Sequence, residues 1–244
     1  MLYVDIEKRL SSFDLRIKFE TDKDPLGLLG ASGAGKSYTL KCIAGIEKPD
    51  KGRIILNGRT LFDSEKKINL PPQKRKVGYL FQEFALFPNM TVLQNIKAGL
   101  HREERANREK IACDLIERFH LEGLQNVRPA TLSGGEKQRT ALARIFASKP
   151  DVLLLDEPFS SLDTFLKWEL EEEMKKIFRE FGGDVVIVSH EIDEVFELCG
   201  EVVRIKDGTS QEMINVKDFY DIILQENKNV RISLSKEKEK MLKK

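Results

Sequence analysis

Apolar and polar positions alternate in the first part of the chain and later give way to short, wholly apolar runs. Residues 2–7 and 13–19 alternate, and each predicts a strand with one buried face. In the second segment that face consists of Phe13, Leu15, Ile17 and Phe19. Residues 53–56 and 60–62, joined by Asn57-Gly58, predict a hairpin. The later runs are typical of parallel strands buried on both faces, and they occupy residues 25–29, 77–81, 152–155, 184–188 and 202–205.

The middle of the chain changes character at about residue 89. Residues 91–100 and 102–120 show helical spacing with many charges. No strand pattern returns before residue 151. This stretch therefore predicts a helical insertion.

Helical segments at residues 166–181 and 191–198 alternate with the later strands. This alternation favours a parallel sheet flanked by helices. We therefore predict an α/β fold with an antiparallel β subdomain at its start. The predicted division is a core of residues 1–88 and 151–244 with an inserted helical subdomain of residues 89–150.

Charge and composition narrow the function. The 244 residues carry 41 Lys and Arg against 40 Asp and Glu, a net charge of +1, so no global field favours nucleic acid. No apolar stretch approaches the ~18–20 residues that cross a bilayer. The start also lacks the basic-then-apolar order of a signal peptide. We expect a cytosolic chain that needs a separate membrane partner for any membrane role.

The three cysteines are spread along the chain. Cys42, Cys113 and Cys199 have neither the spacing of a metal site nor that of a disulfide framework. We expect them to be buried, reduced thiols.

A glycine-rich loop carries the strongest chemical signal. It fits the pattern GxxxxGK[ST] between a strand and a helix, and it consists of Gly30, Ala31, Ser32, Gly33, Ala34, Gly35, Lys36 and Ser37. Glycines let backbone N–H groups curl around a polyphosphate, and the next helix offers further free N–H groups. Lys36 is expected to reach the β- and γ-phosphates, and Ser37 to bind Mg²⁺. Tyr38, the next residue, is counted with this ATP-binding set.

Two carboxylates follow the apolar run 152–155. Ligands bind at the carboxyl ends of parallel strands, which is where Asp156 and Glu157 would lie. Such a pair is common by itself, but beside a phosphate loop it indicates a magnesium-bound triphosphate. Asp156 is expected to hold Mg²⁺, and Glu157 to act as the general base that activates water.

Between these motifs lies Leu-Ser-Gly-Gly-Glu-Lys-Gln-Arg at residues 132–139. With it, the chain resembles the ATP-binding cassette family, the nucleotide-binding subunits of ABC transporters, over roughly residues 1–215. Gln82 after the strand at 77–81 is similar to the family's Q-loop glutamine. Asp163 matches its D-loop, and His190 its switch histidine. The resemblance implies a P-loop NTPase fold with a RecA-like core, an N-terminal antiparallel β subdomain and an inserted helical subdomain.

The resemblance also implies a mechanism. Two copies would pair head to tail as a homodimer, and each would complete the partner's ATP site with Ser133, Gly134, Gly135 and Glu136. Gln82 would sense water and Mg²⁺, joining Ser37 and Asp156 as a metal ligand. His190 would contact the γ-phosphate, and Asp163 would link the two sites. The cofactors implied are ATP and Mg²⁺.

Two further sites are left open by the residues. Phe13 is the candidate for stacking on adenine, with simple core packing as the alternative and Tyr3 in reserve. Phe84, Leu86, Phe87 and Met90 lie where the family receives a helix of its membrane subunit, although packing between the two lobes explains them equally. The segment 74–76, Lys-Arg-Lys, is expected to be a solvated turn.

We therefore expect an ATPase that drives an importer at the cytoplasmic face of the membrane, through integral permease subunits and, indirectly, a solute-binding protein. The sequences of several motifs are most similar to those in cassettes of molybdate and related oxyanion importers. Too few residues follow residue 210 for the additional C-terminal β-domain of many such subunits, so no separate regulatory domain is expected. The alternatives are another solute, or a soluble ABC-type ATPase that acts on nucleic acid or ribosomes.

Overall fold

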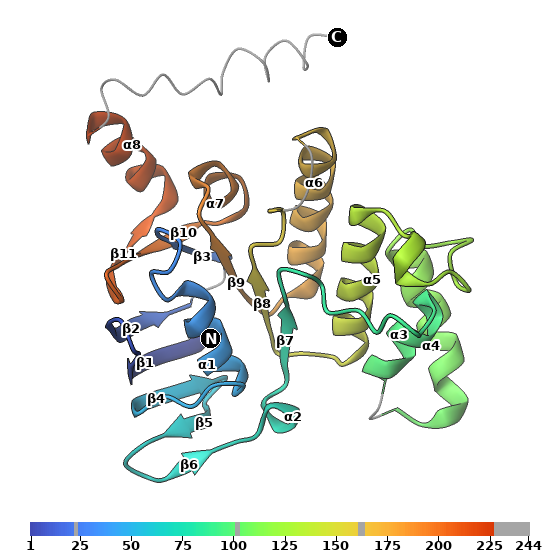
Figure 1. Ribbon diagram of the computed structural model, residues 1–244, viewed down its shortest axis with the longest axis horizontal. Helices are drawn as coiled ribbons and strands as arrows, with labels where there is room; N and C mark the ends of the chain where they lie inside the picture. Colours follow the sequence, from blue (N-terminus) through green and yellow to red (C-terminus); the bar gives the residue numbers. More distant parts are fainter. Residues whose placement is uncertain (22–23, 101–102, 161–163, 227–244) are drawn as a thin grey trace.

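One mixed sheet forms the centre of the computed structural model, which describes residues 1–21, 24–100, 103–160 and 164–226 (Figure 1). Its eleven described strands lie in the order β6-β5-β4-β1-β2-β11-β10-β3-β9-β8-β7. Their bounds are β1 (Leu2–Arg9), β2 (Asp14–Glu20), β3 (Leu26–Leu29), β4 (Lys51–Leu56), β5 (Arg59–Asp63), β6 (Ile68–Asn69), β7 (Val77–Leu80), β8 (Val152–Asp156), β9 (Asp184–Ser189), β10 (Glu201–Lys206) and β11 (Thr209–Asn215). The strands from β10 to β7 run parallel, whereas β1, β2, β4, β5 and β6 pair in antiparallel fashion with their neighbours among them.

The hydrophobic pattern explains this division. Strands β3, β8 and β9 are buried along their whole length, as expected for parallel strands covered on both faces. Strand β2 buries Leu15, Ile17 and Phe19 and exposes the charged residues between them, which confirms the alternating face. Phe13 lies just before the strand and is half-buried. The predicted hairpin of β4 and β5, with positive φ at Asn57 and Gly58, is also confirmed.

Helices cover both faces of the parallel part. Their bounds are α1 (Lys36–Ala44), α2 (Pro72–Arg75), α3 (Val92–Gly99), α4 (Arg105–Arg118), α5 (Gly134–Ala147), α6 (Thr164–Phe181), α7 (Ile192–Leu198) and α8 (Val216–Glu226), with a 3₁₀ turn at Pro129–Thr131. Figure 1 shows α3, α4 and α5 grouped beyond β7, and α1 beside the antiparallel strands. Whether residues 89–150 form a subdomain with those limits stays a prediction. Within the described ranges, no helix combines the length and the apolar character that a membrane span requires.

The sheet separates two hydrophobic cores. Alternate residues of β8 face opposite sides, so that Leu153 and Leu155 pack with the helices of the α3–α8 side. Leu154 packs on the other side, with α1 and the antiparallel strands. The parallel strands are therefore packed on both faces. Their carboxyl ends form the edge of the sheet where the candidate site lies.

Two sequence expectations are wrong. Arg75 is fully buried rather than part of a solvated turn, because its guanidinium donates to the backbone oxygens of Cys42 and Ile43, both at 2.8 Å, at the end of α1. It also donates to Leu70 O and Asn69 Oδ1. Cys113 is exposed on α4, whereas Cys42 and Cys199 are buried as expected.

Candidate functional site

The carboxyl ends of four adjacent parallel strands meet at one edge of the sheet, in the order β3-β9-β8-β7. The phosphate loop follows β3, and Asp156 and Glu157 lie at the end of β8. His190 follows β9, and Gln82 lies two residues after β7. The fold therefore brings together residues that are more than 150 positions apart in the sequence.

The loop between β3 and α1 encloses the side chain of Lys36. Its Nζ donates to Gly30 O at 2.7 Å and to Ala31 O at 2.9 Å. Burial lowers the pKa of Lys36, although the charges of Glu157 and Asp156 act in the opposite direction. Gly35 precedes α1 with φ +101°, and a methyl group there would lie 2.4 Å from Leu15 Cδ1, so the turn requires glycine. Because Gly35 has no side chain, none caps the first N–H groups of α1, which remain donors for phosphate oxygens.

Asp156 lies between two hydroxyl groups. Ser37 Oγ donates to its Oδ1 at 2.7 Å, and Tyr79 Oη donates to its Oδ2 at 2.8 Å. Burial raises the pKa of Tyr79, and the negative charge of Asp156 adds to the effect. The Asp156 carboxylate and the Ser37 hydroxyl are hard oxygen ligands of the kind that Mg²⁺ prefers.

Glu157 contacts the two other candidate catalytic residues. Gln82 Nε2 donates to its Oε2 at 3.2 Å, and His190 Nδ1 lies 3.3 Å from its Oε1. The backbone of Glu157 has φ +47°, a conformation that costs energy for a non-glycine residue and that concentrates at functional sites. Its N–H donates to Val188 O of β9 at 3.0 Å, which holds the residue in that conformation.

A cleft of about 950 Å³ opens beside the phosphate loop. The loop residues 30–34 and Phe13 line it, together with His190, the end of β10 at residues 204–206 and the turn at residues 207–208. The ring of Phe13 lies against Gly208, where a methyl group would come within 2.5 Å of its Cδ2. Tyr3 is not among the lining residues, and its hydroxyl donates to Asp5.

Tyr38 faces away from this cleft in its described contacts. Its hydroxyl donates to Glu47 at 2.9 Å, and its ring packs against the core that contains α1. Tyr38 follows Ser37 in α1, but it is not among the residues that line the cleft. Its place in the ATP-binding set therefore depends on its backbone, next to the loop.

The segment 133–136 lies at the start of α5, apart from this edge. Ser133 is the N-cap of α5: its Oγ accepts from Glu136 N at 3.3 Å, and its N–H donates to Glu136 Oε2 at 2.7 Å. Ser133 is exposed, Gly134 is half-buried and Gly135 is buried. The helix start thus exposes the Ser133 side chain, with the half-buried Gly134 beside it, on the side of the molecule where α3–α5 gather (Figure 1). The predicted D-loop residue Asp163 lies outside the described residues.

Two residues at the edge escaped the sequence analysis. Tyr79 bonds Asp156, and Ser160 Oγ lies 3.4 Å from Gln82 Nε2. A buried tyrosine needs a hydrogen-bond partner for its hydroxyl, so Tyr79 in the strand-like run 77–81 indicated that a partner exists, but not that the partner is Asp156. The contact of Ser160 follows from the path of the chain after β8, which no local pattern specifies.

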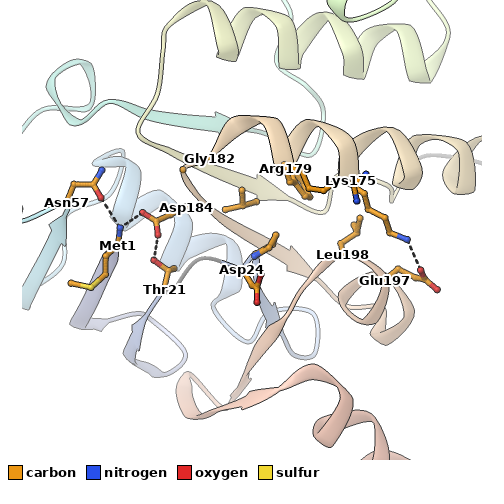
Figure 2. A pocket seen from close by; sticks show the side chains of 14 residues that line it. Met1, Thr21, Asp24, Asn57, Lys175, Arg179, Gly182, Asp184, Glu197 and Leu198 are labelled. Carbon is orange, nitrogen blue, oxygen red and sulfur yellow. Dashed lines mark hydrogen bonds and ion pairs between the residues drawn. The ribbon is translucent and has the colours of Figure 1, made fainter.

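A second cleft, of about 660 Å³, lies at the opposite, amino ends of the parallel strands (Figure 2). Its buried carboxylate, Asp184, is already bonded to the Met1 ammonium at 2.7 Å and to the Thr21 hydroxyl at 2.5 Å. None of the predicted site residues lines this cleft. The phosphate loop, Asp156, Glu157, Gln82 and His190 therefore gather at the carboxyl edge and not at this second cleft.

Comparisons with known proteins agree with the family resemblance of the motifs. A family model described as ABC transporter matches residues 15–160. The chain is 41% identical over 208 residues to the molybdenum import ATP-binding protein ModC of Rhodospirillum rubrum, covering 85% of this chain and 56% of the relative. It is 41% identical over 219 residues to the molybdate/tungstate import ATP-binding protein WtpC of Archaeoglobus fulgidus, covering 90% and 89%. It is also 38% identical over 221 residues to a spermidine/putrescine import ATP-binding protein PotA of Oleidesulfovibrio alaskensis, covering 90% and 57%.

Among solved structures, the chain is similar to a dimeric post-hydrolysis state of the ATP-binding cassette MJ0796 bound to ADP and Pi. The TM-score is 0.73 at 26% identity, and the match covers 88% of this chain and 99% of that one. The chain thus spans little more than half the length of two of these sequence relatives but nearly all of the third and of the solved cassette. The predicted P-loop NTPase fold is confirmed.

Proposed function

The chain belongs to the ABC transporter family, and from that premise we propose that it binds and hydrolyses ATP as the motor subunit of a membrane importer. The observation that carries the proposal is the gathering of Asp156, Glu157, Gln82 and His190 beside the phosphate loop. Asp156 and Glu157 lie at the end of β8, Gln82 follows β7 and His190 follows β9. The order of these strands in the sheet therefore sets the spacing of the side chains. Such an edge is where ligands bind in open α/β sheets.

Binding is the task of the loop and its neighbours. The Lys36 ammonium and the loop N–H groups would neutralise the charge of the phosphates. Mg²⁺ would be held by Ser37 and Asp156, with Gln82 close by, and a hydroxyl 2.7 Å from a carboxylate fits an ion that also takes substrate phosphates and water as ligands. When bound, that ion supplies further neutralisation of phosphate charge. Phe13 on the wall of the cleft is the aromatic ring available to adenine.

Hydrolysis then requires a positioned water molecule. The oxygen of the water would attack the γ-phosphorus while Glu157 accepts a proton from that water. The bond between the γ-phosphorus and the β-phosphate oxygen would break, which releases ADP and phosphate. His190, 3.3 Å from Glu157, would hold the γ-phosphate and the water in line. Most of the rate enhancement comes from position and charge, because phosphoryl transfer needs little covalent help from the protein.

Replacement of Glu157 by Gln tests this function. The variant removes the proton acceptor but keeps the shape of the side chain, so ATP should still bind while steady-state phosphate release falls at least about a hundredfold. Glu180→Gln, which alters an exposed acid on α6, serves as the matched control and should keep the wild-type rate. A Glu157→Gln variant that hydrolyses ATP at the normal rate would rule out Glu157 as the base.

We also propose that the active form is a homodimer in which Ser133 to Glu136 of one copy complete the ATP site of the other. The exposed start of α5 supports this, because an uncovered hydroxyl and nearby helix N–H groups suit a phosphate but lie away from the chain's own loop. A two-fold pair would use the same patches on both copies. The similar solved cassette is itself described as dimeric and bound to ADP and Pi. Asp163 is proposed to link the two sites.

The membrane partner is proposed to dock beside the segment after Gln82. Phe84 is buried and Leu86 packs partly against the core, whereas Phe87 and Met90 expose 46% and 38% of their surface. Packing within the chain thus accounts for Phe84 and Leu86, whereas docking of a partner helix is proposed for Phe87 and Met90. Phe87 and Met90 offer an apolar surface to a helix of a permease, which would place the chain at the cytoplasmic face of the membrane.

The proposed cargo is an oxyanion such as molybdate. Two relatives are named for molybdenum or molybdate/tungstate import, and one for spermidine/putrescine import. The cargo can be tested with the permease that copurifies with the chain: ATP hydrolysis in vesicles should rise with a molybdate-loaded binding protein and not with a spermidine-loaded one. The reverse result would assign a polyamine. Copurification with nucleic acid in place of a permease would contradict the importer itself.

A further inference from the structure

A buried polar network lies directly behind His190. Ser189, the last residue of β9, donates from Oγ to Glu194 Oε2 at 2.6 Å. The Ser189 Oγ also accepts from Glu191 N at 2.9 Å. The Ser189 hydroxyl therefore bonds both the turn that carries His190 and the first turn of α7. Glu194 is only 3% exposed, so its charge needs partners within the protein.

That partner comes from α6. Lys167 Nζ lies 2.6 Å from Glu194 Oε1, and it also pairs with Glu191. Hydrogen bonds to these two carboxylates raise the pKa of Lys167, even though burial alone would lower it. The Lys167 side chain is 18% exposed, so solvent screens the pair less than it screens an ordinary surface pair. Lys167 thus joins the start of α6 to Glu191 and Glu194, the two acidic residues that follow His190.

We propose that Lys167 and Glu194 are positioning residues that hold the turn at residues 189–191 so that His190 stays beside Glu157. The inference rests on the proposed role of His190 in ATP hydrolysis. His190 is about half exposed, and within the described part of the chain its imidazole lies near two carboxylates, Glu157 at 3.3 Å and Glu191 at 4.0 Å. A half-exposed imidazole is held by few packing contacts. The position of the His190 ring therefore depends on the backbone of residues 189–191.

A pair of the same kind elsewhere on the same two helices provides the control. Lys175 of α6 lies 2.8 Å from Glu197 of α7, and both residues line the cleft at the amino ends of the parallel strands (Figure 2). This pair also joins α6 to α7, and its described hydrogen bonds run from Lys175 to Glu172 and Glu197, not to Ser189 or the His190 turn. If Lys167 and Glu194 served only to attach α7 to α6, the two pairs would behave alike.

Histidine NMR of the free chain separates the two explanations. The chain has three histidines, so the His190 imidazole signal can be assigned with a His190→Gln variant. Lys167→Met and Glu194→Gln should each shift or broaden that signal, whereas Lys175→Met and Glu197→Gln should leave it in place. Should Glu194→Gln fail to fold, Lys167→Met still decides, because its side chain reaches the surface. An unchanged His190 signal in Lys167→Met would overturn the proposal.

Kinetics give the second readout. Lys167→Met and Glu194→Gln should lower kcat for ATP roughly tenfold, within the ~100-fold that misplacement of a reacting group can cost, and leave KM nearly unchanged. The Lys175 and Glu197 variants should keep the wild-type kcat, and equal losses in both pairs would overturn the positioning role. A His190→Ala variant with full turnover would contradict the proposed function instead, while the NMR comparison would still decide whether the link orders the turn.

Discussion

Three buried or half-buried cations illustrate how single residues are held in this chain. Lys36 is bonded by two carbonyl oxygens of its own loop, and Lys167 by two carboxylates. Arg75 is fully buried, and its described hydrogen bonds go to three backbone oxygens and the Asn69 side chain. Burial lowers the pKa of Arg75 to about 10. The acceptors differ with the role of the cation. Phosphate oxygens can replace the loop carbonyls that accept from Lys36, which suits a binding residue. The carbonyls that accept from Arg75 lie at the end of α1, which suits a structural residue.

Replacement of Arg75 by Met should therefore lower the free energy of unfolding. The carbonyl oxygens of Cys42 and Ile43 would lose their donor inside the protein, which costs about 3 kcal/mol for charged hydrogen bonds of this kind. Urea unfolding would show the midpoint moving down with an unchanged slope. Lys74→Met, which alters the exposed neighbour, should stay within about 0.5 kcal/mol of the wild type. Equal stability of the two variants would contradict the structural role of Arg75.

The three cysteines should react at very different rates. Burial raises the pKa of Cys42 to about 12 and raises that of Cys199 as well, so neither forms thiolate at pH 8, and neither is accessible. Cys113 is exposed. A disulfide reagent at pH 8 should therefore titrate one thiol quickly in the native chain, and Cys113→Ser should abolish that fast phase. Two or more fast thiols would show that the burial of Cys42 or Cys199 is wrong.

At the scale of elements, the hydrophobic pattern predicted the wholly apolar strands and the alternating ones, and it missed β6 and β11. The runs that became β3, β8 and β9 are apolar throughout, and their strand character is intrinsic. Strand β11 is largely exposed and polar, and it is a strand because β10 lies beside it. The two residues of β6 and the single turn of α2 are too short for any periodicity. Helix α8 was missed although it does bury Val216 and Phe219.

Two helix starts offer a matched test of what Ser133 does. Helix α5 begins with the capping box of Ser133 and Glu136, and α3 begins with that of Thr91 and Gln94. Ser133→Ala and Thr91→Ala each remove one cap and should each destabilise the chain by about 1 kcal/mol, measured by urea unfolding. ATP turnover should fall only in Ser133→Ala, because only that hydroxyl is proposed to meet the partner's phosphate. A similar loss of turnover in both variants would assign Ser133 a purely structural role.

At the scale of the whole molecule, the sheet order decides which predicted residues meet. Motifs identified the phosphate loop, Asp156, Glu157, Gln82 and His190, but their distances follow from the adjacency of β3, β9, β8 and β7, which no local pattern contains. Contacts such as Tyr79 to Asp156 and Lys167 to Glu194 could not be predicted for the same reason. The start of α5 lies with α3 and α4, so one copy presents the two halves of the proposed site on separate surfaces. A complete site of the proposed kind therefore requires a second copy of the chain.

Light scattering of the Glu157→Gln variant tests that requirement most directly. Without hydrolysis, ATP should persist in the site and join two copies, so the measured mass should double with ATP and Mg²⁺ and stay unchanged with ADP. Adding Ser133→Arg to the same variant should keep the mass at that of one copy while ATP still binds. A variant that remains a monomer with ATP bound, or that still dimerises after the Ser133→Arg substitution, would contradict a site shared between two chains.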